Sequence, residues 1–362
     1  MSLAVVNPEV YEQQLDDKSH LIKAEFSSFD IPELEVFSSA PKHYRMRAEF
    51  SVWHDDDRSY YRMFNPETKA PFEVTEFPAG STRICELMPA LMAAISQQHI
   101  LRHRLFQIEF LTTQSGQALI SLIYHKALNE QWEIAARNLQ SQFSITIIGR
   151  SRKQKQVLTQ DYVTETLTVE GRQYQYQQVE NSFTQPNAGV NEKMLTWASQ
   201  CSQESQGDLL ELYCGNGNFT CVLARHFQKV LATEISKTSV HSARENFQLN
   251  GINNVEIARL SSEELTQAMN GERIFRRLSD IDLPSYDFST VFVDPPRAGL
   301  DKGTEALVKR FEKILYISCN PETLKANLDS ICETHRIERI ALFDQFPYTH
   351  HAEMGVYLRR KS

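Results

Sequence analysis

The stretch that organises this chain of 362 residues reads Lys313-Ile314-Leu315-Tyr316-Ile317-Ser318-Cys319-Asn320-Pro321-Glu322-Thr323. Its first part, residues 314–317, is a continuous apolar run, which is typical of a strand buried on both faces of a parallel sheet. A helix start follows, because Asn320 can cap a helix and Pro321 fits a first turn, where no N–H is required. Cys319 therefore falls at the carboxyl end of a buried strand, directly before a helix.

This position gives Cys319 a chemical interpretation. In open α/β sheets, ligands bind at the carboxyl edge of the strands. The unpaired N–H groups of a helix start also favour a thiolate over a thiol, so the sequence predicts a reactive cysteine. The ordinary alternative is a buried structural cysteine, and the rest of the chain has to decide between the two.

Strand and helix alternate from residue 181 onward. We expect strands over 208–213, 229–233, 255–260, 290–293 and 314–319, and helices over 188–201, 218–227, 237–250, 262–270, 303–311 and 321–333. A terminal pair of strands over 337–343 and 355–358 could close the sheet. Repeated strand–helix units predict a doubly wound, Rossmann-like α/β domain over residues 181–362.

Residues 1–180 follow another pattern and predict a smaller α+β domain. An acidic amphipathic helix over 9–28 precedes expected strands over 43–53, 60–64, 105–111, 118–124, 145–148, 166–169 and 174–179, with helices over 87–99 and 129–142. Basic and aromatic residues lie together at 44–47, 102–106 and 124–126, and a basic cluster follows at 150–155. Such clusters hold the bases and phosphates of RNA loops, which favours an RNA-binding domain. An aromatic core with solvated cations is the alternative.

The composition narrows the class of protein. The formal net charge of −8 argues against indiscriminate coating of nucleic acid, although one specific RNA needs only a positive contact face. No apolar run is long enough to span a membrane, and the first residues do not resemble a secretory signal. The six cysteines include no C-x-x-C pair, so we expect no metal site, no disulfide framework and a reducing cytoplasm.

The first strand–helix junction of the second domain contains a G-x-G turn. It reads Glu211-Leu212-Tyr213-Cys214-Gly215-Asn216-Gly217-Asn218-Phe219. Glu234 ends the next strand, where a carboxylate can accept hydrogen bonds from both hydroxyls of a ribose. The third glycine of the dinucleotide fingerprint is replaced by Thr220. Because a pyrophosphate would need that glycine and an adenosyl sulfonium would not, S-adenosylmethionine fits this junction better than NAD does.

Two further segments carry acidic residues at or near the same edge. Asp294 ends the fourth strand and is followed by Pro295-Pro296-Arg297, a pattern found in many base-modifying methyltransferases. A rigid structural turn is the alternative explanation. Near the C-terminus, His350-His351-Ala352-Glu353 does not have the spacing of a zinc motif. Glu353 is more attractive as a general base, provided that the fold returns it to Cys319.

Together these segments resemble the tRNA (uracil-5-)-methyltransferase family. The motifs that carry the resemblance are Ser182-Phe183-Thr184-Gln185, residues 210–219, Asp294-Pro295-Pro296-Arg297, Ser318-Cys319-Asn320-Pro321 and His350-His351-Ala352-Glu353. The resemblance also reaches residues 43–50, Phe106 and His125. It implies S-adenosylmethionine as methyl donor and, as substrate, the T-arm loop of tRNA at uridine 54 or other RNAs with a similar loop. It implies no obligate protein partner.

The resemblance also implies a role for each site residue. The cofactor-binding positions are Gln185, Tyr213, Asn218, Glu234 and Asp294. Cys319 is the implied nucleophile, which adds to C6 of the uracil, and Glu353 is the implied acceptor of the C5 proton. Related ribosomal RNA uracil-5-methyltransferases often carry an added β-barrel and a four-cysteine iron–sulfur cluster. This chain shows no matching cysteine cluster, which favours tRNA as substrate and no cluster.

Three alternatives remain open at this point. The first is a ribosomal RNA uracil-5-methyltransferase. The second is an RNA cytosine-5 methyltransferase, which is disfavoured because those enzymes typically place a cysteine after the proline that here follows Asp294. The third is a non-catalytic RNA-binding protein or chaperone on the same fold.

Overall fold

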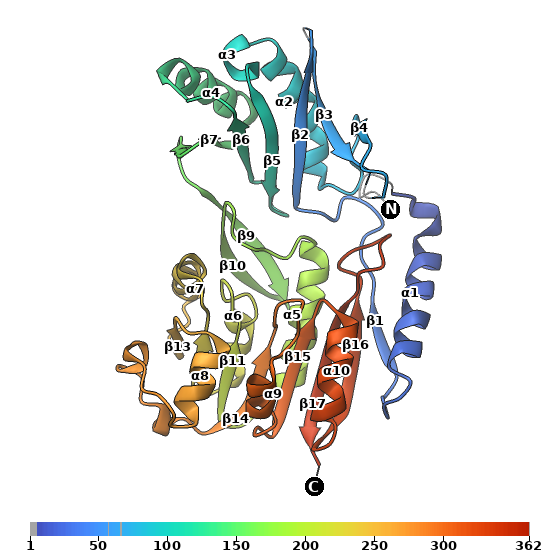
Figure 1. Ribbon diagram of the computed structural model, residues 1–362, viewed down its shortest axis with the longest axis vertical. Coiled ribbons are helices and arrows are strands. Elements are labelled where there is room, and N and C mark those ends of the chain that lie inside the picture. Colours follow the sequence, from blue (N-terminus) through green and yellow to red (C-terminus); the bar gives the residue numbers. More distant parts are fainter. Residues whose placement is uncertain (1–5, 57, 66, 362) are drawn as a thin grey trace. The chain divides into compact units, whose positions relative to one another are not determined.

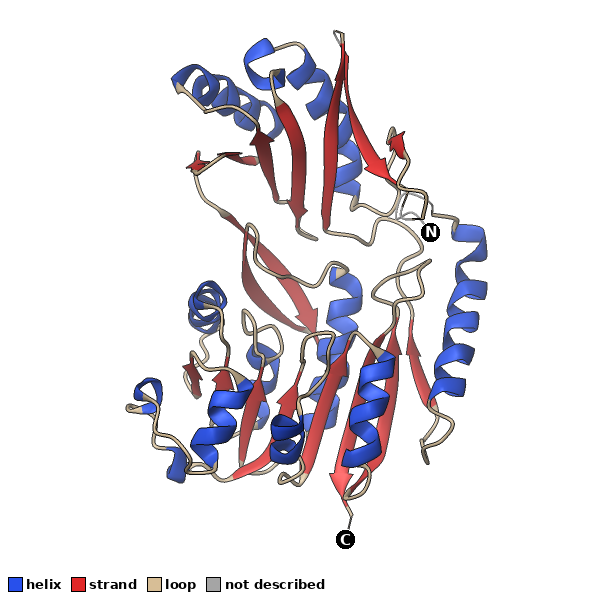
Figure 2. Cartoon of the chain, viewed as in Figure 1, coloured by secondary structure: helices blue, strands red, loops and turns tan. Residues whose placement is uncertain are grey.

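A computed structural model of the protein describes residues 6–56, 58–65 and 67–361 (Figures 1 and 2). The chain forms two compact units. Unit 1 comprises the described residues up to Tyr11, together with Ala40–Thr166 and Gln177–Ala188; unit 2 comprises Glu12–Ser39, Leu167–Tyr176 and Gly189–Ser362. The predicted domain boundary near residue 180 remains a prediction. No helix in the described part of the chain is long and apolar enough to cross a membrane.

Unit 2 contains the predicted Rossmann-like sheet, with eight strands among the described residues. In spatial order they are β1 (Leu34–Phe37), β16 (His335–Phe343), β17 (Glu353–Arg360), β15 (Lys313–Ser318), β14 (Phe288–Val293), β11 (Asp208–Leu212), β12 (Val230–Thr233) and β13 (Val255–Ala258). β17 runs antiparallel to both of its neighbours, and the other neighbouring strands pair in parallel. The predicted terminal pair is confirmed, whereas β1 was missed because its four residues carry too short a pattern.

Helices alternate with these strands in unit 2. They are α1 (Tyr11–Glu25), whose first residue is counted in unit 1, α5 (Ala188–Ser202), α6 (Thr220–Leu223), α7 (Lys237–Leu249), α8 (Ser262–Met269), α9 (Lys302–Val308) and α10 (Pro321–Ile331), with 3-10 turns η2 (Ala224–His226), η3 (Arg276–Leu278) and η4 (Leu283–Ser285). One apolar core joins strand and helix side chains, among them Ile22 of α1, Leu324 of α10 and Val356 of β17. Buried β15 matches the apolar run that the sequence shows.

Unit 1 is built on a seven-stranded sheet of described residues. In spatial order its strands are β4 (Pro71–Glu73), β3 (Arg58–Phe64), β2 (Arg47–Asp55), β5 (Leu105–Thr112), β6 (Ala118–Tyr124), β7 (Thr146–Ser151) and β8 (Gln154–Val157). Its helices are α2 (Thr82–Ser96), α3 (His99–Arg102) and α4 (Glu130–Phe143), after the short turn η1 (Pro8–Val10). The hairpin of β9 (Tyr162–Val169) and β10 (Arg172–Val179) contributes residues to both units.

Two of the aromatic residues that suggested an RNA-binding face are core residues instead. Tyr44 is 5% exposed and Tyr124 is 2% exposed. The hydroxyl of Tyr124 donates to the carbonyl of Leu101, which satisfies its polar end inside the core. For these two residues the alternative of an aromatic core was the correct interpretation. Phe106, by contrast, is exposed.

Candidate active site

The registers of the parallel strands bring three predicted site residues to one edge. Leu212 of β11 pairs with Thr233 of β12 on one side and with Val293 of β14 on the other. The residues that follow these three are Tyr213, Glu234 and Asp294. They therefore leave the sheet at the same level of its carboxyl edge, where α/β proteins bind ligands.

Cys319 and Glu353 meet through an antiparallel pair at the same edge. Ser318 of β15 pairs with Met354 of β17. Because the register of an antiparallel pair runs in opposite directions, Cys319 and Glu353 occupy the next opposed positions. Glu353 is buried, whereas Cys319 is partly exposed. Glu353 can act as a base only if the fold brings it next to Cys319. The strand register meets this condition.

Glu234 holds the glycine turn from the neighbouring strand. Its Oε2 accepts a hydrogen bond from the N–H of Gly215 at 3.0 Å, and its Oε1 accepts one from the N–H of Ser236 at 2.7 Å. Gly215 has a φ of 57°, and a Cβ built there would meet no atom within 4 Å, so the space beside it is open. At Gly217 a Cβ would lie 2.7 Å from the ring of Phe247, so glycine is required.

Tyr213 and Asn218 are each held by hydrogen bonds within unit 2. Tyr213 has a φ of 61°, and its hydroxyl donates to Oγ of Ser262 at 2.6 Å. The side-chain amides of Asn218 and Asn191 donate to one another at 2.9 Å. Gln185 belongs to unit 1, so its part in the site remains a prediction.

The loop after Asp294 is anchored to the helix that follows Cys319. The predicted cap is confirmed, because Asn320 caps α10 and its Oδ1 accepts from the N–H of Glu322. Asn320 Nδ2 and the hydroxyl of Thr323 both donate to the carbonyl of Arg297, each at 3.1 Å. The loop carrying Asp294 and the helix behind Cys319 are thus one hydrogen-bonded assembly.

The electrostatics of Cys319 differ from the expectation of a favoured thiolate. Burial first, then the carboxylates of Glu353 and Asp294 in that order, raise the pKa of the Cys319 thiol to about 11. The helix start does not overcome this effect, because its N–H groups are already used: that of Asn320 donates to Oγ of Ser318, and that of Glu322 to Asn320. In the protein alone Cys319 is a thiol at neutral pH.

The two carboxyl groups beside Cys319 are themselves shifted towards their neutral forms. Burial raises the pKa of Asp294, whose surface is partly exposed. The pKa of Glu353 is raised by burial first and by Asp294 second. Like charges at short range disfavour each other's ionisation, so each of these two carboxyl groups favours the neutral form of the other.

Two polar residues that support the site were not predicted from the sequence. Glu211 on β11 is buried, and burial raises its pKa to about 8, with the hydroxyl of Thr220 opposing the shift. Its carboxylate oxygens nevertheless make no hydrogen bond of ordinary geometry. An acidic residue inside an otherwise apolar strand was the available signal. Asn327 of α10 is the second, and a lone asparagine in a helix gives no such signal.

Asn327 binds the far end of the Asp294 loop. Its Oδ1 accepts from the N–H of Leu300 at 2.9 Å and from the hydroxyl of Tyr316 at 2.8 Å. Its Nδ2 donates to the carbonyl of Leu300 at 3.1 Å and to Oε2 of Glu305 at 2.9 Å. A single buried amide therefore joins the loop, β15 and α9.

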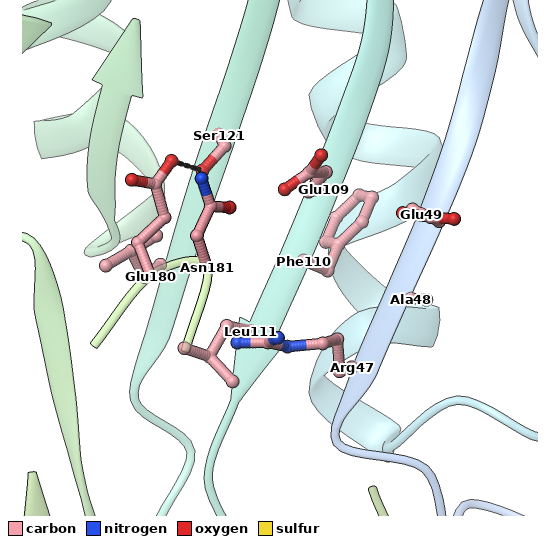
Figure 3. Close-up of a pocket in the computed structure, with 10 residues that line it drawn as sticks. Arg47, Ala48, Glu49, Glu109, Phe110, Leu111, Ser121, Glu180 and Asn181 are labelled. Atoms are coloured by element: carbon pink, nitrogen blue, oxygen red, sulfur yellow. Dashed lines mark hydrogen bonds between the residues drawn. The ribbon is translucent and has the colours of Figure 1, made fainter. Parts of the chain in front are cut away.

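Unit 1 contains a separate polar pocket on its sheet (Figure 3). Glu49 of β2 lies directly opposite Glu109 of β5, and burial, followed by the charge of Glu49, raises the pKa of Glu109. Glu180 lines the same pocket and pairs with Arg150 at 2.5 Å and with the hydroxyl of Ser121 at 2.7 Å. Two like charges on facing strand positions destabilise a sheet, so this pair does not contribute to the stability of unit 1.

The rings of His350 and His351 lie 4.2 Å apart between centroids. Within the described ranges, no group of three or more histidine, cysteine, aspartate or glutamate side chains could hold a metal ion.

A mainly parallel α/β sheet with a G-x-G turn, a carboxylate placed to bind a ribose and a cysteine opposite a carboxylate defines a Rossmann-like methyltransferase. The chain belongs to the tRNA (uracil-5-)-methyltransferase family, whose profile matches residues 10–361. The predictions of fold class, family and enzyme class are thereby confirmed.

Individual relatives agree with this assignment. The tRNA/tmRNA (uracil-C(5))-methyltransferase of Vibrio atlanticus is 57% identical over 364 residues, covering 99% of each chain. The protein of the same name from Cellvibrio japonicus is 58% identical over 351 residues, covering 97% of this chain and 96% of its own. The solved tRNA (uracil-54, C5)-methyltransferase of Pyrococcus abyssi, in complex with S-adenosyl-L-homocysteine, has a TM-score of 0.72 at 21% identity. That likeness covers 96% of this chain and 83% of the other, and it supports the fold.

Proposed function

We propose that this protein transfers a methyl group from S-adenosyl-L-methionine to C5 of uridine 54 in the T-arm loop of tRNA. The observation that carries the proposal is the opposed position of Cys319 and Glu353 at the sheet edge that also carries Glu234. The relatives named tRNA/tmRNA (uracil-C(5))-methyltransferases support the substrate class. Position 54 rests on the motif resemblance and on the name of the Pyrococcus abyssi enzyme.

The residues at the carboxyl edge fit an adenosyl ligand. Open space beside Gly215 lets the backbone approach a ligand closely, and Glu234 lies next to it as acceptor for ribose hydroxyls. Gln185, Tyr213, Asn218 and Asp294 are proposed as the other cofactor-binding residues. When bound, S-adenosylmethionine supplies a methyl group on a positively charged sulfur.

Cys319 makes the reaction possible because C5 of uracil is too weak a nucleophile by itself. The thiolate of Cys319 adds to C6, a C6–S bond forms, and the electron pair of the C5–C6 double bond moves into an enolate that makes C5 nucleophilic. After C5 has gained the methyl group, it carries both that group and its original proton. The ring is then saturated and bonded to the protein.

Glu353 completes the reaction by elimination. Its carboxylate takes the C5 proton, the released electron pair restores the C5–C6 double bond, and Cys319 leaves as a thiolate. The net reaction replaces one C5 proton by a methyl group and releases that proton. The raised pKa values keep Cys319 and Glu353 in their neutral forms in the protein alone. A cationic ligand beside them would favour the thiolate and the carboxylate, which are the forms that the reaction uses.

The RNA is proposed to bind unit 1. The target base lies inside a folded loop, so it must leave its stack to reach Cys319. Phe106 is exposed and its ring meets that of His125 edge-on at 3.9 Å between centroids. The carboxylates of Glu49 and Glu109, which line the pocket in Figure 3, can accept hydrogen bonds from amino groups of bases.

The experiment that tests the proposal is covalent trapping with tRNA that contains 5-fluorouridine. Fluorine replaces the C5 proton, so Glu353 has nothing to remove and the protein–RNA bond should survive denaturing electrophoresis. We expect an adduct with the wild-type protein and none with Cys319→Ala. Absence of the wild-type adduct, or an equal adduct with Cys319→Ala, would refute the proposed nucleophile.

Nucleoside mapping tests the position. We expect 5-methyluridine at position 54 after incubation of unmodified tRNA with the protein and S-adenosylmethionine. A methylated uridine elsewhere, or methylation of ribosomal RNA without methylation of tRNA, would replace the proposed target. Binding of tRNA without methyl transfer would support the non-catalytic alternative instead.

A further inference from the structure

The acidic helix α1 has a buried polar contact that its sequence did not explain. Nζ of Lys18 donates to Oδ1 of Asp344 at 2.7 Å and to the carbonyl of Phe346 at 3.0 Å. Lys18 is 6% exposed and Asp344 is fully buried. Asp344 directly follows β16, and the loop that it begins leads to Glu353, the first residue of β17.

A second residue of α1 contacts the same loop. Gln14 lies one helical turn before Lys18, and its Nε2 donates to Oδ2 of Asp344 at 3.0 Å. Its Oε1 accepts a hydrogen bond from the backbone N–H of Tyr348 at 3.1 Å. Tyr348 has a φ of 61°, a left-handed conformation that is unfavourable for a tyrosine. The contact with Gln14 therefore stabilises a strained turn five residues before Glu353.

The other end of α1 contacts the helix that follows Cys319. Oε1 of Glu25 pairs with Nζ of Lys325 on α10 at 3.1 Å. Ile22 and Phe26 of α1 share an apolar core with Leu324 of α10. One helix thus contacts both segments that carry the proposed reacting residues, and Figure 1 shows it beside β1 at that side of the sheet.

We propose that Gln14 and Lys18 are positioning residues that hold the loop of residues 344–352 so that Glu353 can reach the C5 proton. A buried Lys–Asp pair is a poor device for stability alone, because the cost of removing both charges from water offsets their attraction. Its directed contacts with Asp344 and Phe346 are better explained by a requirement for loop geometry. This inference rests on the proposed role of Glu353.

The test uses Lys18→Met, with Lys23→Met as matched control. Lys23 is an exposed lysine on the same helix. The substrate is T-arm RNA that contains ordinary uridine, and S-adenosylmethionine is present. We expect turnover to fall on the order of 100-fold in Lys18→Met, because a misplacement of about 1 Å has this effect on a catalytic group. Formation of the Cys319 adduct should keep its wild-type rate, so the denaturation-resistant adduct accumulates.

Further variants separate positioning from folding. Lys18→Arg, which keeps the charge, should restore most of the turnover. Gln14→Ala removes the acceptor for Tyr348 and leaves the Lys18–Asp344 pair intact, so it should accumulate adduct even if Lys18→Met does not fold, as judged by thermal melting. Lys23→Met should behave as the wild type in both measurements.

The inference is overturned if folded Lys18→Met or Gln14→Ala turns over at the wild-type rate. It is also overturned if adduct formation slows as much as turnover does, because that pattern indicates a general structural loss. Failure of the wild-type protein to form an adduct with 5-fluorouridine RNA would instead refute the proposed function. The two failures are therefore distinguishable.

Discussion

Alkylation of Cys319 offers a direct measure of the electrostatics at the sheet edge. With a thiol pKa of about 11, about one Cys319 in a thousand is a thiolate at pH 8. Iodoacetamide consumes only the thiolate, so its rate should rise about tenfold for each pH unit and level off near the pKa. Glu353→Gln removes the carboxylate that, after burial, raises the pKa of the Cys319 thiol most, and it nearly conserves the side-chain volume. Since loss of a nearby negative charge favours the thiolate, the pKa should fall by roughly one unit and the rate should rise about tenfold.

The assay follows two cysteines in one sample. Protein is alkylated near pH 10, and the peptides that carry Cys319 and Cys332 are quantified by mass spectrometry. Cys332 is an internal reference, because burial raises its thiol pKa to about 11 as well, but its charged neighbours are Lys361 and Asp329. Its rate should be the same in the wild type and in Glu353→Gln.

Two results would refute this reasoning. A wild-type profile for Cys319 that levels off below about pH 9 would mean that the helix start lowers the pKa after all. A Cys319 rate that is unchanged in Glu353→Gln, or that changes equally at Cys332, would show that Glu353 does not act on the thiol.

Three further predictions concern the reaction, the cofactor and the loop. Glu353→Gln should lower turnover about 10²–10⁴-fold and accumulate the adduct with ordinary uridine RNA on denaturing gels, whereas loss of the adduct as well would contradict a role in elimination. Glu234→Ala should weaken binding of S-adenosylhomocysteine about 10- to 100-fold in calorimetry, and an unchanged affinity would remove Glu234 from the cofactor site. Asn327→Ala should lower the free energy of unfolding in urea by about 2–4 kcal/mol, because four buried hydrogen bonds are lost; a change below about 0.5 kcal/mol would show that the loop relaxes without it.

The sequence could predict most of the elements that carry the site, because their signals are local. The apolar run of β15 and the cap at Asn320 lie within ten residues, and both are confirmed. The short strand β1 was missed because its four residues give too little pattern, and only its pairing with β16 in the structure identifies it as a strand. The state of Cys319 was also predicted wrongly, because burial of the thiol and, second, the carboxylate of Glu353 from the end of the chain raise its pKa.

Taken alone, the sequence determined which chemical groups exist and on which strand ends they fall, since strand periodicity, glycine turns and helix caps depend on neighbouring residues. Only the tertiary structure decided that Glu353 faces Cys319 and that α1 contacts both of their segments. Those relations join residues more than thirty positions apart, and they follow from strand register and helix packing, which no local pattern specifies.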